Sequence, residues 1–196
     1  CSTWMLASSR VWLNDDDPPQ YSDWSAPVNL GPAVNWPDKS DQHPCISKDG
    51  LSLYFSSGRP GGFGDMDIYV SQRASTDAPW GAPQNLGPHV NSPYREFYPS
   101  LSPDGHTLYF SSNRPGGFGG QDIYVSRRHN KRDDFAWQPV ENLMSAINTA
   151  AGESFPFLFE DDETGSITLY FSSGRPGGMG GTDIYASTLQ PDETFG

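Results

Sequence analysis

The chain has 196 residues and a formal net charge of -12, and it contains 21 glycines, 18 prolines, 6 tryptophans, 9 tyrosines and 11 phenylalanines. An acidic chain repels polyanions, so the composition argues against a nucleic-acid partner. No apolar stretch reaches the roughly 20 residues that a transmembrane helix needs, so no membrane span is expected. Many aromatic residues between Gly- and Pro-rich turns favour short strands over disorder.

Residues 1–23 are expected to form an N-terminal segment or a degenerate partial blade. Within them, residues 4–10 and 11–14 faintly echo strands of the later repeats. Trp24 to Leu30 resembles an outer strand that no complete repeat precedes. The repeat domain is therefore placed at residues 24–196.

One pattern occurs three times in that domain. Each copy has a Leu-Tyr-Phe-Ser-Ser run, an Arg-Pro-Gly-Gly loop and an Asp-Ile-Tyr segment. The arginines of the three loops are Arg59, Arg114 and Arg175, and the aspartates that follow them are Asp67, Asp122 and Asp183. Tandem copies of this size indicate a repeat architecture.

Each copy predicts four short antiparallel strands. In chain order these are residues 43–47, 53–57, 67–69 and a segment that begins at Trp80; residues 98–102, 108–112, 122–124 and a segment that begins at Trp137; and residues 155–159, 169–173 and 183–185. Asp-Gly pairs supply the hairpin turns of the first two copies, and no helical pattern is present. Four antiparallel strands per repeat are typical of a β-propeller blade, so the predicted fold is an all-β propeller with three repeats per chain.

The run Ser-Pro-Asp-Gly-His-Thr-Leu-Tyr-Phe-Ser-Ser-Asn-Arg-Pro-Gly-Gly at residues 102–117 resembles the WD-like β-propeller repeat family. Blades of this type occur in the periplasmic Tol translocation protein and ahead of peptidoglycan-binding outer-membrane domains. The resemblance covers residues 24–188, although Lys48 replaces the family's proline and the third copy lacks the short turn. It implies the fold and a periplasmic or extracellular location. It leaves function open, because the family includes scaffolds, binding modules and enzymes.

Three repeats are too few to close a ring, since propellers usually have about 4 to 8 blades. The strand at Trp24 to Leu30 is surplus, and the third repeat has no fourth strand before Gly196. Two copies that exchange these strands would make a six-bladed homodimer with twofold symmetry. One alternative is a four-bladed monomer in which residues 4–10 and 11–14 join Trp24 to Leu30 as a degenerate blade. A fragment of a longer chain and another oligomer are the remaining alternatives.

The Arg-Pro-Gly-Gly loops are interpreted as structural. Arg59 and Asp67 flank one hairpin and could pair across it, as could Arg114 with Asp122 and Arg175 with Asp183. The glycines permit a tight loop of unusual φ. No helix follows the loop to bind a phosphate.

A candidate cation site lies where each repeat leads into its first strand. Aligning Pro44, Pro99 and Pro156 places Asp41, Glu96 and Glu153 at one equivalent position, followed by His43, Tyr98 and Phe155. First strands line the channel of a propeller, so one carboxylate per blade would form an acidic ring that a cation could neutralise. Oxygen ligands suit Ca²⁺, and His43 would extend the choice to Zn²⁺ or Mn²⁺. The alternative is that these acids hydrogen-bond backbone amides as part of the repeat.

Two functions are open at this stage. The first is a binding module that holds a protein, a peptide or a small molecule such as a glycan, with contacts from Trp36, Tyr94 and Phe97. The second is a metal-dependent hydrolase of lactones, esters or phosphotriesters, with Asp41, Glu96 and Glu153 as ligands and His43 as the base.

Overall fold

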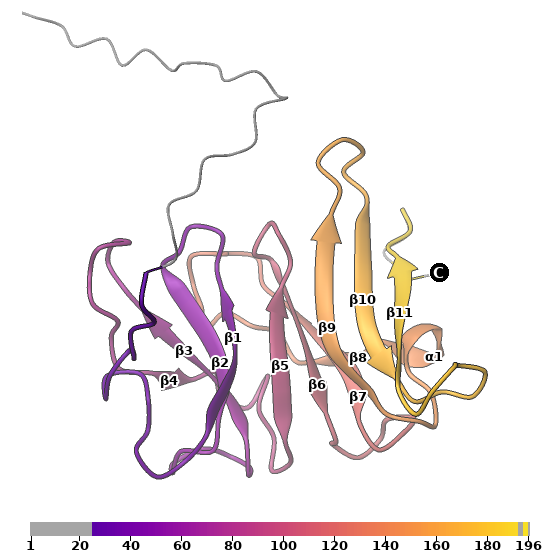
Figure 1. Cartoon of the computed structure of the whole chain (residues 1–196), viewed down its shortest axis with the longest axis horizontal. Coiled ribbons are helices and arrows are strands. Elements are labelled where there is room, and N and C mark those ends of the chain that lie inside the picture. The colour runs from indigo at the N-terminus through magenta and orange to yellow at the C-terminus, as the bar shows by residue number, and fades with distance from the viewer. Residues whose placement is uncertain (1–24, 192–193, 196) are drawn as a thin grey trace, which may run out of the picture.

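The computed structural model describes residues 25–191 and 194–195, which form three small antiparallel sheets arranged as blades (Figure 1). Residues 1–23, and with them the predicted degenerate blade, lie outside the described residues. Blade one contains β1 (Asp41–Ile46), β2 (Ser52–Ser57), β3 (Asp67–Gln72) and β4 (Gln84–Asn85). Blade two contains β5 (Glu96–Leu101), β6 (Thr107–Ser112), β7 (Asp122–Arg127) and β8 (Glu141–Asn142). Blade three contains β9 (Glu153–Glu160), β10 (Ile167–Ser173) and β11 (Asp183–Thr188).

The Leu-Tyr-Phe-Ser-Ser runs become the central strands β2, β6 and β10, as predicted. Their alternating side chains serve two different cores. Tyr54 packs in a cluster with residues of blade two, whereas Phe55 packs against Val34 and Tyr69. Blade one therefore buries one side of its central strand against blade two, and Tyr109 makes the same contact between blades two and three.

The fourth strands are shorter than predicted. The segments that begin at Trp80 and Trp137 contain only the two-residue strands β4 and β8. Pro83 and Pro139 precede these strands and cannot donate a ladder hydrogen bond, which limits the pairing. Residues 25–30, predicted as an outer strand, lie outside any strand, because no described residues supply a third strand for them to pair with.

One short helix, α1 (Met144–Ile147), corrects the expectation that helices are absent. It follows β8, and its residue Ile147 is buried in the cluster between blades two and three. The helix therefore anchors a connection between blades and does not cover a sheet. No helix in the described part of the chain is long and apolar enough to span a bilayer.

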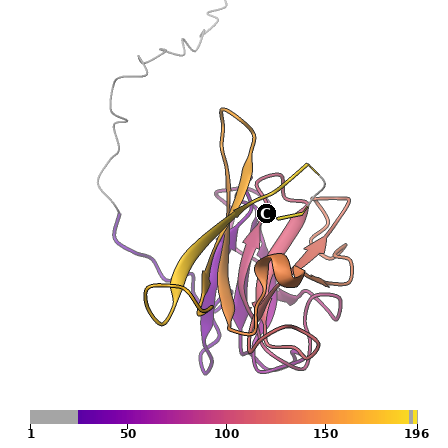
Figure 2. The same cartoon turned by 90° about the vertical axis from the view of Figure 1, so that its right-hand side faces the viewer.

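The three blades form an open arc, with blade one and blade three at its opposite ends (Figure 1). Strands β1, β5 and β9 face the viewer side by side, and the short strands β4 and β8 lie behind (Figure 1). Seen from the end of the arc, the β9–β10 hairpin projects beyond the rest of the sheets (Figure 2). The inner strands thus share one exposed face, where the candidate site lies.

Candidate functional site

Each inner strand carries the same irregularity. The pairing register shifts between Gln42 and Cys45 in β1 and between Phe97 and Ser100 in β5, and β9 has the equivalent shift opposite Phe171. In each case two residues, the second of them a proline, face one residue of the central strand, which is a β-bulge. The proline has no N–H to donate, so it fits a position that leaves the ladder.

The residue before each of these prolines has a left-handed backbone. The φ angles are 55° at His43, 57° at Tyr98 and 56° at Phe155. A bulky residue at positive φ is strained by about 1–3 kcal/mol, and such strain concentrates at functional sites. The same strained position therefore holds a ring-bearing side chain in all three blades.

These rings meet, although their residues are far apart in the chain. The ring centroids lie 4.0 Å apart for His43 and Tyr98 and 3.7 Å apart for Tyr98 and Phe155. Phe97 adds a fourth ring, with its centroid 5.6 Å from that of Tyr98 and 6.0 Å from that of His43. We call these four residues the aromatic cluster. It is the structural result of placing three equivalent bulges next to one another.

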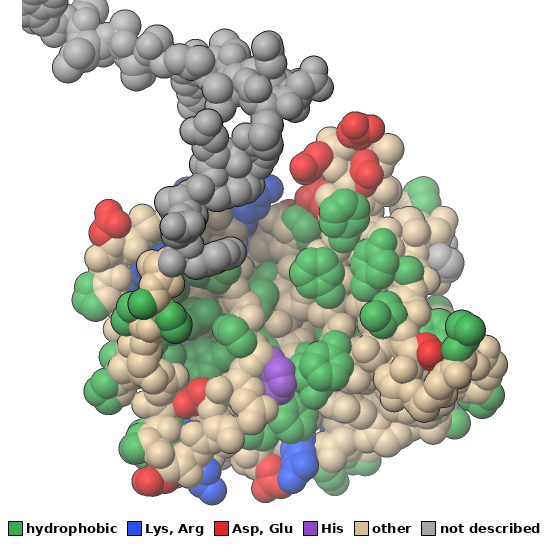
Figure 3. Space-filling view, in the orientation of Figure 1, with side chains coloured by type: hydrophobic (Ala, Val, Ile, Leu, Met, Phe, Trp, Pro, Cys, Tyr) green, Lys and Arg blue, Asp and Glu red, His purple; other side chains and the backbone are tan. Residues whose placement is uncertain are grey.

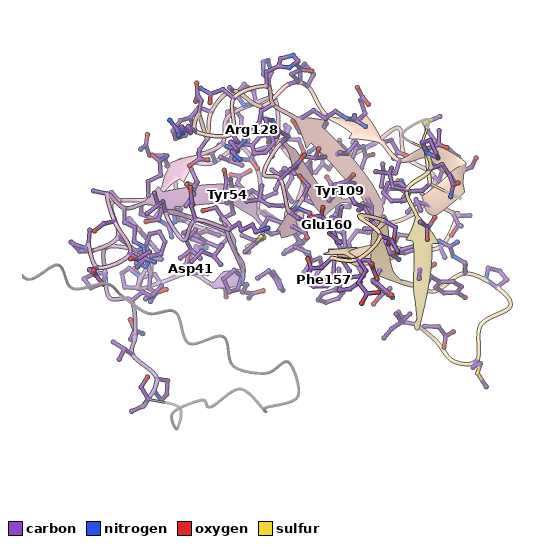
Figure 4. All side chains as sticks on the ribbon, turned by 90° about the horizontal axis from the view of Figure 1, so that it is seen from above. Asp41, Tyr54, Tyr109, Arg128, Phe157 and Glu160 are labelled. Carbon is purple, nitrogen blue, oxygen red and sulfur yellow. The ribbon has the colours of Figure 1, made fainter. Side chains whose placement is uncertain are left out.

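The aromatic cluster is open to solvent and continues along β9. Phe155 is 51% exposed, Phe157 63% and Phe159 48%. Hydrophobic side chains gather over β9 beside the histidine on this face (Figure 3). Phe157 lies on this inner side of the sheets, opposite the side that holds Arg128 (Figure 4).

A hollow of about 530 Å³ lies along the inner strands here. Its lining contains no acidic or basic side chain apart from the imidazole of His43. The side chains that line it include those of His43, Cys45, Tyr98, Phe155 and Phe157. A surface of this kind suits a neutral ligand with apolar faces.

His43 is the polar member of the aromatic cluster. Its Nδ1 atom is buried and has no hydrogen-bond partner among the described residues. Burial lowers the pKa of its imidazole below the ordinary value, so the ring is neutral at neutral pH. Among the cluster residues, it alone has a ring nitrogen, and that Nδ1 is enclosed by the protein.

Asp41, Glu96 and Glu153 occupy equivalent positions, as the alignment predicted. Each is the first residue of its inner strand and lies opposite Ser57, Ser112 or Ser173. Each carboxylate accepts hydrogen bonds inside its own blade. Glu96, for example, accepts from the Ser92 amide at 3.0 Å and from Ser112 Oγ at 2.9 Å.

An arginine neutralises each of these carboxylates. The N–O distances are 2.7 Å from Arg59 to Asp41, 2.9 Å from Arg114 to Glu96 and 3.6 Å from Arg175 to Glu153. Their charges are thus compensated by guanidinium groups within each blade. In the described residues no group of three or more His, Cys, Asp or Glu side chains is arranged to hold a metal ion.

Hydrogen bonding sets the protonation of Asp41. Burial alone would raise the pKa of its carboxyl. Hydrogen bonds from Ser57, the Trp36 amide and Arg59, with the charge of Arg59, outweigh burial and hold this pKa below its ordinary value. Asp41 is therefore ionised at neutral pH without a bound cation.

The predicted pairing of Arg59 with Asp67, and of its two counterparts, is wrong. The arginines pair with the first residues of the inner strands, and Asp67 accepts hydrogen bonds from its own loop instead. The loop amides that donate to Asp67, Asp122 and Asp183 are 2.7, 2.8 and 2.9 Å away, from Phe63, Phe118 and Met179 respectively. Asp41 and Asp67 both stand opposite Ser57, one on each side of β2, so register alone does not choose between them. The amides of Phe63 and Gly64 and the side chain of Asn85 bind Asp67, and Arg59 pairs with Asp41.

The predicted contact residues are spread out. Phe97 belongs to the aromatic cluster. Trp36 (40% exposed) lines a separate hollow beside the first Arg-Pro-Gly-Gly loop, and Tyr94 is 43% exposed on the connection into β5. Sequence reasoning did not assign a role to Tyr98 or Phe155. The sequence feature that points to these two residues is that each directly precedes one of the aligned prolines.

Comparison with known proteins supports the fold alone. No protein-family model and no curated protein sequence matches the chain. An α-L-arabinofuranosidase from Lactobacillus brevis matches with a TM-score of 0.55 at 12% identity over 83% of this chain and 57% of its own. An endo-arabinase from Bacteroides thetaiotaomicron matches with a TM-score of 0.52 at 18% identity over 80% of this chain and 57% of its own. A putative TolB from Agrobacterium tumefaciens matches with a TM-score of 0.47 at 20% identity, over 76% of this chain and 42% of its own.

The chain thus spans about half the length of these solved structures. At such low identity the likeness to the two glycosidases extends to architecture and not to their reactions. Together with the three antiparallel blades, it identifies an all-β, propeller-like domain whose described blades form an unclosed arc.

Proposed function

We propose that this domain is a carbohydrate-binding module whose ligand site is the aromatic cluster. The observation that carries the proposal is the meeting of His43, Tyr98 and Phe155, three strained ring-bearing residues from three blades, on an exposed face. Strained positions of this kind persist only where the surrounding structure enforces them.

The chemistry of the surface favours a neutral sugar over a charged partner. The C–H faces of a sugar ring pack on flat aromatic faces, and the exposed phenylalanines of β9 extend that surface along one strand. The two propeller glycosidases act, by name, on arabinose-containing glycans, and we extend that ligand class to this chain as part of the proposal.

The proposal includes a closed ring formed by two copies and a periplasmic or extracellular location. A ring would surround the aromatic cluster with inner strands on all sides. An exterior location would bring the site to polysaccharides, in keeping with the resemblance of residues 102–117 to periplasmic propeller repeats.

The test is isothermal titration with arabinan and with arabino-oligosaccharides. Tyr98→Ala should weaken binding about two- to tenfold, since one aromatic contact contributes about 0.5–1.5 kcal/mol. Phe135→Ala is the matched control, because Phe135 is a 43% exposed phenylalanine outside the aromatic cluster. Equal binding by the Tyr98→Ala protein, or no binding by the unmodified protein, would contradict the proposal.

The same samples address the cation and the hydrolase predicted from sequence. Metal analysis and hydrolysis of a lactone and a nitrophenyl ester, with and without chelator, should show no metal-dependent turnover. The physical reason is that Arg114 already neutralises Glu96, so cation binding there must displace an ion pair. Metal-restored turnover that Glu96→Gln abolishes would replace the binding module with the hydrolase.

A further inference from the structure

Successive blades meet through one repeated apolar contact. Tyr54 of blade one is fully buried in a cluster with Leu86, Val90, Leu108 and Phe110. Tyr109 of blade two, at the equivalent position, is buried with the equivalent residues Ile147, Leu169 and Phe171. The tyrosine of each central strand therefore inserts into a site formed by the next blade and the segment that leads into it.

Among residues 25–191 and 194–195, no blade packs beyond blade three, which presents the same tyrosine. Tyr170 is 41% exposed, whereas Tyr54 and Tyr109 are 0% and 5% exposed. Ile184, also on this flank, is 80% exposed, although its counterparts Ile68 and Ile123 are both 0% exposed. We call this side of blade three the donor flank.

Blade one carries the counterpart, which no side chain in the described part of the chain fills as Tyr54 fills its site. Leu30, Val34, Leu53 and Phe55 occupy the repeat positions of Leu86, Val90, Leu108 and Phe110. They line a hollow of about 140 Å³. We call this side of blade one the acceptor flank. It has the same residue classes as the site that holds Tyr54.

The backbone hydrogen bonds between blades follow the same rule. Asn91 binds the N–H and the carbonyl of Ile68 at 2.8 and 2.9 Å, and Asn148 binds those of Ile123 at the same distances. Asn35 is the counterpart on the acceptor flank, and its Nδ2 already donates to Asn29 at 2.9 Å, as that of Asn91 donates to Asn85. By repeat position, the backbone that Asn35 would bind is that of Ile184 on the donor flank.

We infer that the donor flank of one chain binds the acceptor flank of a second copy, with Tyr170 in the Leu30–Phe55 hollow and Asn35 on the backbone of Ile184. The two flanks lie at opposite ends of the arc, so those of one chain do not meet (Figure 1). In two copies related by a twofold axis, the donor flank of each copy binds the acceptor flank of the other. The two contacts together close a six-bladed ring. The second copy is the occupant because its acceptor flank matches the donor flank residue by residue.

This pairing also completes the inner face. Strands β1, β5 and β9 of both chains would surround one axis, so the aromatic clusters of the two copies would border the same channel. The interface depends on the flanks alone. Its test is therefore separate from that of carbohydrate binding.

The first experiment measures mass by light scattering across a dilution series. The unmodified full chain should have twice the 21.5 kDa mass of one chain. Tyr170→Glu should reduce it to one chain, because it would place an unpaired carboxylate in an apolar site. Phe118→Glu is the matched control, since Phe118 is 43% exposed in a loop away from both flanks, and it should leave the dimer intact.

The second experiment is a cross-link that does not depend on loss of folding. Gln84 pairs with Val70 across β4 and β3, and the equivalent residues of the proposed interface are Val28 and Ala186. Facing residues of antiparallel strands are about 4.5–5.5 Å apart at Cα, within disulfide range. Val28→Cys/Ala186→Cys in a Cys1→Ser background should give a covalent dimer on oxidation, and either cysteine alone should not.

A mass of one chain for the unmodified protein would overturn the inference. A dimer that survives Tyr170→Glu and fails to form the 28–186 disulfide would also overturn it, because the copies would then associate through another surface.

Discussion

At the scale of single residues, the Arg-Pro-Gly-Gly loops explain why glycine recurs at one position. A Cβ atom on Gly117 would lie 1.6 Å from Oδ2 of Asp122, the aspartate that accepts the loop amides. We predict that Gly117→Ala destabilises the protein by about 2 kcal/mol through overpacking, as measured by urea unfolding. Gly120→Ala is the control, since no atom lies within 4 Å of its Cβ position. A similar loss in both variants would disprove the steric explanation.

A second residue-scale prediction concerns His43. The pKa of its imidazole is lower in the folded protein than the ordinary value of 6.5. At a pH between these two pKa values, the unfolded chain binds more protons than the folded protein. Stability from this residue is therefore present above the ordinary pKa and lost as the pH falls through that window. His43→Phe should flatten the dependence of melting temperature on pH there, while His129→Phe, at an exposed site, should not. Equal slopes in all three proteins would contradict the assignment.

At the scale of elements, the contact between blades one and two contains a buried ion pair. Arg128 donates to Asp134 at 2.5 Å, both side chains are nearly inaccessible, and Tyr54 also donates to Asp134. Burial would raise the pKa of Asp134, but hydrogen bonds from Ser52, Tyr54 and Arg128, with the charge of Arg128, keep it below its ordinary value. Tyr54 and Arg128 lie toward the same junction of the sheets (Figure 4).

Removing one member of this pair leaves a buried charge without a partner. We predict that Asp134→Ala lowers the free energy of unfolding by about 3–5 kcal/mol, as measured by chemical denaturation. The control is Asp65→Ala, which breaks the exposed Arg95–Asp65 pair and should cost at most about 1 kcal/mol. If the two variants lose equal stability, the buried pair does not hold the blades together.

Features that recur in all three repeats could be predicted from the sequence, whereas contacts that depend on the folded geometry could not. The central strands and the equivalence of Asp41 with Glu96 and Glu153 were predictable, because three copies reinforce each pattern. The partner of Arg59 was not, since Asp41 and Asp67 both stand opposite Ser57 and only the folded loop shows that its amides bind Asp67. The aromatic cluster was missed for a related reason. It requires a positive φ at His43, which composition and alternation do not encode.

At the scale of the whole molecule, the net charge of each chain opposes the association of two copies. Each chain has a net charge of -12, so two copies repel as they approach. The proposed interface is apolar with backbone hydrogen bonds, and salt therefore screens the repulsion without weakening the contact. At about 0.15 M ionic strength the screening length is about 8 Å.

Added salt should accordingly strengthen the dimer. We predict that its dissociation constant falls as sodium chloride rises from low to physiological concentration, as measured by analytical ultracentrifugation. The Phe118→Glu protein should show the same trend, because its flanks are unchanged. A dimer that dissociates in salt would indicate that ion pairs hold the copies together, and the apolar contact of Tyr170 with the acceptor flank would then not be the interface.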